Sequence, residues 1–237
     1  MHARWGSIEN MSSNDLENNV NDAALAKGRR AFVTVLTLAR APLILAATGS
    51  AIVHAFRPAW GWLAATVVLM ALSAITDCFD GKLARKWCVT SRFGALADPM
   101  MDKVFYVATL PAAVFLAMVG GSVRHAAILF ALDIVSMLRD QWVSFLRSVG
   151  SAYAADVRAS WSGKFRTALA FHVIVAIYLY LGLRSLGVLD MLPAPWRTGV
   201  SAFLAFFELL LIAVTFVTGW CYTVRYMPYL RRAAQER

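Results

Sequence analysis

The chain has 237 residues, of which 59% are hydrophobic and 16% are charged. A soluble domain is about half apolar and about a quarter charged, so this composition excludes an ordinary soluble domain and predicts an integral membrane protein. The net charge of +9 fits basic loops that face anionic lipid, and we expect no nucleic-acid partner.

The first 30 residues differ from the rest of the chain. They are polar, rich in Asn, Ser, Asp and Glu, and contain no apolar segment of the kind found in a cleaved signal peptide. We expect residues 1–30 to form a flexible or weakly amphipathic cytoplasmic tail. Residues 31–230 are then expected to form one membrane domain, followed by a basic cytoplasmic tail at 231–237.

Six apolar segments follow the tail, each near the roughly 20 residues that cross a bilayer core of about 30 Å. None alternates with the period of a strand, so a β-barrel is not expected. The sequence predicts an all-α bundle of six transmembrane helices. The predicted spans are residues 32–56, 60–77, 104–119, 126–146, 168–186 and 200–222.

The distribution of basic residues predicts the orientation of this bundle. Lys and Arg are concentrated before the first span, between spans two and three, between spans four and five, and after span six. The opposite loops hold few of them: Arg57, Arg124, Arg184 and Arg197. By the positive-inside rule, both termini and the loop between spans two and three face the cytoplasm.

Four aspartates lie around that cytoplasmic loop: Asp77, Asp80, Asp98 and Asp102. An Asp at the centre of a membrane helix costs about 2.5–3.5 kcal/mol, so four of them need protonation, ion pairing or a bound metal as compensation. The first two are three residues apart and the last two are four apart, so each pair lies on one helix face. Carboxylate oxygens suit Mg²⁺ or Mn²⁺, whereas zinc prefers His and Cys ligands.

Other residues of the same segment fit a diphosphate ligand. Gly81 and Gly94 leave room for backbone or substrate to approach. Arg85 lies about one turn beyond Asp80, where it can make charge-assisted hydrogen bonds to a diphosphate beside the metals. The alternatives are a topological role for Arg85, as a cation that pairs with lipid phosphate, and local ion pairs for the aspartates at solvated helix ends.

The spacing of these residues resembles the signature of the CDP-alcohol phosphatidyltransferases. Every fixed position is present: Asp77-x-x-Asp80-Gly81-x-x-Ala84-Arg85-x8-Gly94-x3-Asp98-x3-Asp102. The resemblance implies six transmembrane helices, a homodimer and a polar site that opens to the cytoplasm. We accordingly expect a multi-pass protein of a bacterial cytoplasmic (inner) membrane, with its active site on the cytoplasmic face.

The resemblance also implies roles for single residues. Two divalent ions, Mg²⁺ or Mn²⁺, would be bound by the motif carboxylates Asp77, Asp80, Asp98 and Asp102. Asp102 would in addition be the general base that deprotonates the acceptor hydroxyl. The CDP portion of the donor, CDP-diacylglycerol, would be contacted by Thr37, Gly81, Arg85 and Ser91. The acceptor hydroxyl would attack the β-phosphorus of this donor, and CMP would leave.

Several shorter segments resemble one branch of the family, which makes phosphatidylglycerophosphate. These segments are residues 36–40, 84–87, 91–95, 98–99 and 102–104, and the stretch 162–167 resembles a Gly-Lys-x-Lys-Thr run of the same branch. The implied function is the transfer of a phosphatidyl group from CDP-diacylglycerol to sn-glycerol 3-phosphate, a small phosphorylated alcohol.

Span four gives a physical reason for a phosphorylated acceptor. Asp133, Asp140 and Arg147 recur every seven residues, an interval that drifts only about 20° around a helix, so they share one polar face. We expect Arg139, Arg147 and Lys164 to bind the acceptor phosphate, because a neutral or cationic alcohol would not need three cations. The alternatives are an internal ion pair of Arg139 with Asp140 or Asp133, and a boundary role for Lys164.

Two other functions stay open on the sequence alone. The same chemistry could use inositol phosphate, serine or another alcohol as its acceptor. A divalent-cation transport or binding protein would also place Asp pairs within a membrane. Transport, however, does not require Gly81, Arg85 and Gly94 at these positions.

Overall fold

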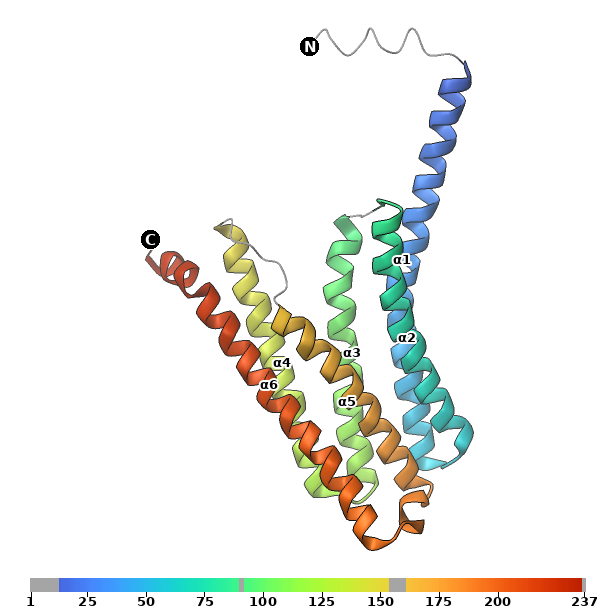
Figure 1. Cartoon of the computed structure of the whole chain (residues 1–237), viewed down its shortest axis with the longest axis vertical. Coiled ribbons are helices and arrows are strands. Elements are labelled where there is room, and N and C mark those ends of the chain that lie inside the picture. The colour runs from blue at the N-terminus through green and yellow to red at the C-terminus, as the bar shows by residue number, and fades with distance from the viewer. Residues whose placement is uncertain (1–12, 90–91, 154–160, 236–237) are drawn as a thin grey trace. The chain divides into compact units, whose positions relative to one another are not determined.

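The chain folds into long helices joined by short connections (Figure 1). The computed structural model describes residues 13–89, 92–153 and 161–235. These residues form six α-helices, one 3₁₀ helix and no strand, which confirms the prediction of an all-helical protein. The elements are α1 (Ser13–Phe56), α2 (Trp60–Lys86), α3 (Arg92–Val119), α4 (Val123–Ala152), α5 (Trp161–Ser185), η1 (Val188–Met191) and α6 (Ala194–Gln235).

Five of the helices are long and apolar enough to cross a membrane, as expected for an integral membrane protein. The candidate spans lie in α1, α2, α3, α5 and α6, and the shortest of them, Met100–Val119, has 20 residues. α4 is long enough to cross a membrane, but charged residues are spread along its whole length. Any 18 consecutive residues of α4 include at least three charged ones. The fourth predicted span, residues 126–146, therefore stays a prediction.

Several helix ends lie well outside the predicted spans. α1 begins at Ser13, within the predicted tail. α2 continues to Lys86 and α3 already begins at Arg92, so all four motif aspartates lie inside helices. Polar residues lower the local hydropathy, but they do not end a helix, because its hydrogen bonds are made by the backbone.

α2 ends in a Schellman turn just after the acidic motif. Cys88 has a φ of 52°, in the left-handed region. The Val89 N–H donates to the Ala84 carbonyl (3.1 Å), and the Cys88 N–H donates to the Arg85 carbonyl (3.3 Å). These two bonds satisfy carbonyl groups that the end of the helix would leave unpaired.

The chain divides into two compact units, each described here by itself. Unit 1 comprises Met1–Arg40 and Ser73–Met101, and unit 2 comprises Ala41–Leu72 and Asp102–Arg237. Within unit 2, α4 packs along α6, and α5 packs on α6 and η1. The core of unit 2 is apolar and includes side chains at most 1% exposed: Leu129, Leu132, Ile174, Ile177 and Leu211.

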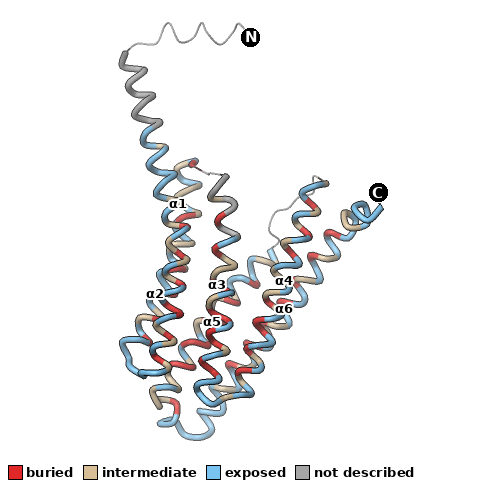
Figure 2. Tube along the Cα trace, turned by 180° about the vertical axis from the view of Figure 1, so that it is seen from behind, coloured by how far each residue is buried: buried red, intermediate tan, exposed pale blue. Residues whose placement is uncertain are grey.

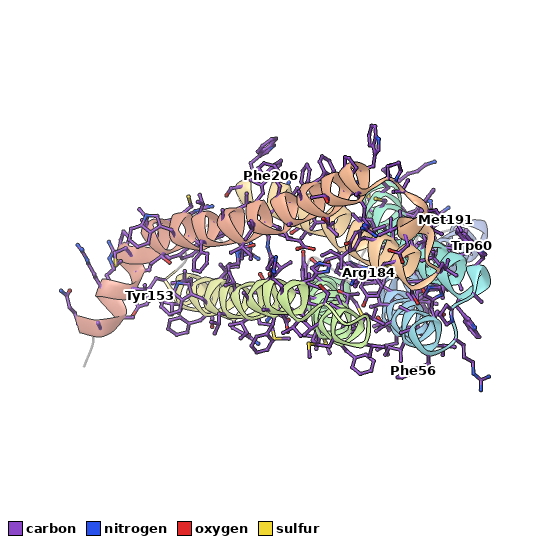
Figure 3. The ribbon with its side chains drawn as sticks, turned by 90° about the horizontal axis from the view of Figure 1, so that it is seen from below. Phe56, Trp60, Tyr153, Arg184, Met191 and Phe206 are labelled. Carbon is purple, nitrogen blue, oxygen red and sulfur yellow. The ribbon has the colours of Figure 1, made fainter. Side chains whose placement is uncertain are left out.

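α6 has a buried stripe and a lipid-compatible stripe. Its buried residues recur every three or four positions, and Figure 2 shows them along the length of the helix: Leu204, Glu208, Leu211, Thr215, Thr218, Tyr222 and Tyr226. Large apolar side chains elsewhere on α6 are 60–71% exposed: Phe203, Phe206, Phe216 and Trp220. Phe206 points away from the other helices (Figure 3). The buried stripe is thus more polar than the exposed one, as expected when lipid is the surrounding solvent.

Gly182 allows α5 to approach α2 closely. A Cβ at this position would clash with Leu63 Cδ1, and the Gly182 carbonyl lies 3.1 Å from His54 Nε2. We expect Gly182→Ala to lower the free energy of unfolding by about 1–3 kcal/mol, because overpacking forces neighbouring groups to shift. Unfolding in detergent measures this effect. The control is Gly49→Ala, since a Cβ there meets no atom within 4 Å, and equal losses in both variants would contradict the close packing.

Candidate active site

Two polar contacts join α1 to the first half of the acidic motif. Thr37 Oγ1 donates to Asp80 Oδ2 over 2.8 Å, and Arg40 Nη1 lies 2.6 Å from Asp77 Oδ1. Each pair of residues is three positions apart on its own helix, so one face of α1 meets one face of α2. Thr37, Arg40 and Asp80 are buried, with 5–6% of their surface exposed. This part of the motif is therefore held by specific contacts within unit 1.

Arg40 is a site residue that the sequence analysis missed. It could have been found as a cation inside an apolar predicted span, because such a cation must pair with an opposite charge or reach the membrane interface. The available counter-charges were the motif aspartates, and Asp77 is the one that pairs with it. Thr37 was predicted to contact CDP, and here it holds Asp80.

Gly81 and Arg85 are one helical turn apart on α2. A Cβ on Gly81 would lie 3.6 Å from Arg85 Nη1, so the Arg85 side chain turns back along the helix over the glycine. A Cβ here would be in ordinary van der Waals contact with the guanidinium group, so the two positions share one surface of α2. Ser91 lies outside the described residues, and for Asp98 only the backbone, within α3, is described.

The donor set of the motif fits a hard divalent cation. Among the described side chains, no group of three His, Cys, Asp or Glu residues surrounds a metal position. The motif fits a divalent ion through the type of its side chains, because carboxylate oxygens are the ligands that Mg²⁺ and Mn²⁺ prefer. The Asp77 side chain is 44% exposed, so it is accessible to an ion from solution.

Arg139, Asp140 and Arg166 form one charged network within unit 2. Arg139 Nη1 lies 2.8 Å from Asp140 Oδ1. Arg166 Nη1 donates to both Asp140 oxygens, over 3.1 and 3.2 Å. Arg166 is 1% exposed and is the largest fully buried side chain of the described residues. The internal ion pair considered for Arg139 and Asp140 is thus present, with Arg166 as an additional partner.

Tyr222 on α6 brings two of the predicted phosphate-binding residues together. The guanidinium carbons of Arg139 and Arg147 each lie 5.4 Å from the centre of its ring. Arg147 Nη2 also donates to the Tyr222 hydroxyl over 3.0 Å. Because the ring accepts a cation on its face, one tyrosine can hold two arginines close to each other.

Three buried guanidinium nitrogens in this region have no hydrogen-bond partner among the described residues. They are Arg139 Nε, Arg147 Nε and Arg166 Nη2. More than nine in ten buried polar groups are paired in native proteins, and each buried donor left alone costs about 1–3 kcal/mol. Three guanidinium groups and one carboxylate give a net charge of +2. The arrangement suits an anion that carries several acceptor oxygens.

Lys164 lies apart from this network. It is exposed and precedes Arg166 by two residues, which places it about 200° around α5 from that arginine. Of the three cations predicted to bind the acceptor phosphate, Arg139 and Arg147 come together and Lys164 lies elsewhere on the helix surface. Arg166 was within the segment that the sequence analysis singled out, but it was not chosen as a site residue.

Tyr106 connects the network to Asp102. The Arg166 guanidinium carbon lies 4.7 Å from the centre of the Tyr106 ring. Tyr106 follows Asp102 by four residues on α3, so both lie on one face of that helix. Asp102, Asp140 and Arg166 all act electrostatically on the Tyr106 hydroxyl. The predicted general base is therefore close to the buried cations.

The chain belongs to the CDP-alcohol phosphatidyltransferase family, whose sequence model matches residues 31–226. It is thus an enzyme of phosphatidyl transfer, as the resemblance of the acidic motif predicted. Similar proteins bear the name CDP-diacylglycerol–glycerol-3-phosphate 3-phosphatidyltransferase. The one from Cereibacter sphaeroides is 30% identical over 222 residues, which cover 83% of this chain and 96% of that protein.

Two further relatives carry the same name. The protein from Yersinia enterocolitica is 30% identical over 153 residues, covering 65% of this chain and 71% of its own length. The protein from Haemophilus influenzae is 33% identical over 102 residues, covering 43% and 52%. No solved structure matches the chain significantly.

Proposed function

We propose that this protein transfers a phosphatidyl group from CDP-diacylglycerol to sn-glycerol 3-phosphate and releases CMP. The reaction is the one in the name of the Cereibacter sphaeroides relative, which aligns over 96% of its length. The observation that supports a phosphorylated acceptor is the set of three buried guanidinium nitrogens that have no hydrogen-bond partner within the described part of the chain. Such donors match the oxygens of a phosphate group.

The donor side of the proposed site is the acidic motif. Two divalent ions, Mg²⁺ or Mn²⁺, are bound by Asp77, Asp80, Asp98 and Asp102. When bound, such ions stabilise the charge that develops on the phosphoryl oxygens and on the leaving group. Thr37 and Arg40 orient two of the carboxylates from α1. CDP contacts come from Thr37, Gly81, Arg85 and Ser91.

The acceptor side of the proposed site is the cation network. Arg139 and Arg147 bind the acceptor phosphate, and Lys164 remains a predicted contact. Asp102 accepts the proton of the acceptor hydroxyl as that hydroxyl attacks the β-phosphorus of the donor, and CMP leaves. A carboxylate that also binds a metal is a weaker base, so the position of the hydroxyl must supply part of the effect.

The proposed membrane arrangement follows from charge and hydropathy. Residues 31–230 form a domain of six transmembrane helices, with the tails 1–30 and 231–237 in the cytoplasm. The support for this topology is the basic loops. We place the protein in the inner membrane of a bacterium, as a homodimer with its active site at the cytoplasmic face.

The test is CMP release by the purified protein in mixed micelles with CDP-diacylglycerol and Mg²⁺. We expect release with sn-glycerol 3-phosphate to exceed release with glycerol, serine, inositol or inositol phosphate. Faster release with inositol phosphate or serine would keep the reaction type and change the acceptor. No CMP with any acceptor, from protein that remains folded, would contradict the proposal.

A further inference from the structure

We propose that a cavity in unit 2 binds the headgroup of an anionic phospholipid, with Arg184 as the contact to its phosphodiester. The cavity has a volume of about 270 Å³. This is close to the lower end of the roughly 300–1,000 Å³ of ligand pockets, so the cavity suits a headgroup and not a whole lipid. The site is separate from the proposed active site and does not depend on the proposed reaction.

The cavity lies at the end of unit 2 that is remote from the charged network of Arg166. It is lined by the last turns of α1, α3 and α5, by the beginning of α2 and by Asp190 of η1. Arg184 follows Arg166 by 18 residues on α5, which corresponds to about 27 Å along the helix. In the proposed topology, this end of the molecule faces the outer leaflet.

The walls of the cavity are fixed by polar contacts within the protein. Three of the lining residues, His54, Thr66 and Tyr178, are at most 3% exposed. Each of them has a polar side-chain atom 2.8–3.1 Å from a backbone carbonyl oxygen. The cavity is therefore preformed, and these side chains already use their polar atoms within the protein.

Arg184 is the cation of this cavity that has no counter-charge. Its side chain is partly buried and makes no hydrogen bond or ion pair with residues 13–89, 92–153 or 161–235. The carboxylate in the lining, Asp190, pairs with Arg197 over 3.2 Å instead. Two cations and one carboxylate leave a net charge of +1. A phosphodiester carries one negative charge and can accept hydrogen bonds from the guanidinium group.

The surroundings of the cavity indicate that this anion belongs to a lipid. Leucine, alanine and valine side chains also line the cavity. Trp60 and Trp62, at the beginning of α2, are 63% and 42% exposed, and Trp side chains at the ends of membrane helices lie at the level of the headgroups. Figure 3 is seen from this end and shows Arg184 between the helices, with Phe56 and Trp60 at the outer edge. A phosphodiester at Arg184 can therefore keep its acyl chains in the bilayer.

The central variant is Arg184→Gln, and its matched control is Arg124→Gln. Arg124 is an exposed residue in the first turn of α4, and it does not line the cavity. Both changes remove one positive charge from the side of the membrane that is predicted to be external. The unfolding temperature of each protein is measured in a phosphate-free detergent as phosphatidylglycerol, diacylglycerol or inorganic phosphate is added.

Phosphatidylglycerol at about 100 times its dissociation constant should raise the unfolding temperature of the parent protein and of Arg124→Gln by about 5–10 °C. In Arg184→Gln the dissociation constant should rise about 10- to 100-fold, because a hydrogen bond to a charged group is lost. Diacylglycerol has the acyl chains without the phosphate, and inorganic phosphate has no acyl chains. Neither should give an increase that depends on Arg184.

Three results would overturn the inference. The first is equal stabilisation of Arg184→Gln and the parent protein by phosphatidylglycerol. The second is an increase with diacylglycerol as large as that with phosphatidylglycerol, which would mean that lipid covers the surface without a phosphate site. The third is an Arg184-dependent increase with inorganic phosphate alone, which would assign the cavity to a free anion.

A second variant tests the cavity while it keeps the charge of Arg184. Ala55 lines the cavity, so Ala55→Leu places three more carbon atoms in or beside the proposed headgroup position. We expect it to weaken phosphatidylglycerol binding as Arg184→Gln does. The control is Ala202→Leu, the same change at an exposed residue of α6, which should bind like the parent protein. Parent-like binding by both alanine variants would exclude the cavity as the place where the headgroup binds.

Discussion

Replacing Asp102 by Asn is expected to lower the rate of CMP release by at least about 1,000-fold. Asn has nearly the same size and shape, but its amide oxygen cannot take a proton from the acceptor hydroxyl. General-base catalysis typically contributes about 10²- to 10⁴-fold, and the proposed metal contact of the same carboxylate would be lost as well. The measurement is the initial rate of CMP release at saturating concentrations of both substrates.

A matched control isolates this effect. Asp190→Asn makes the same chemical change in η1, on a side chain that is 72% exposed and pairs with Arg197 at the surface. Its activity should equal that of the parent protein. Raising Mg²⁺ or Mn²⁺ then separates the two roles of Asp102. If Asp102→Asn regained the full parent rate at a high metal concentration, Asp102 would be a metal ligand and not the general base. If Asp102→Asn kept more than a tenth of the parent rate at an ordinary metal concentration, neither role would hold.

The Arg40→Met variant is expected to lose about 2–3 kcal/mol of stability in the absence of divalent ions. The Arg40 side chain is 7% exposed and the Asp77 side chain is 44% exposed. Breaking a fully buried pair costs about 3–5 kcal/mol, whereas a surface pair is worth about 1 kcal/mol or less. A half-buried pair falls between these limits. Unfolding of the purified protein in detergent with EDTA measures the loss.

Added Mg²⁺ gives the more specific result. Arg40→Met removes one cation that lies 2.6 Å from the Asp77 carboxylate, so a bound cation should recover more stability in Arg40→Met than in the parent protein. Arg30→Met is the control, because Arg30 is an exposed residue of the same helix. Equal stabilisation of all three proteins by Mg²⁺ would contradict a metal-binding role for Asp77.

The acidic motif and its placement on helices could be predicted from the sequence. Its residues are close together in the chain, and a helix puts positions three or four apart on one face, so spacing alone indicates which carboxylates can act together. The predicted spans, by contrast, missed the helix ends. α1 begins at Ser13 and α3 begins at Arg92, because hydropathy reports the length of the apolar segment and not the length of the helix.

The sequence by itself determined the helical class, the acidic motif and the family of this protein, since these depend on local composition and on spacing along one chain segment. Only the tertiary structure decided which cations work together. Tyr222 contacts Arg147 across 75 positions of sequence, and Arg166 pairs with Asp140 across 26. A buried guanidinium group must be paired or bind an anion. Which carboxylate or ring it meets depends on how the helices pack, and residue spacing within one helix does not contain that information.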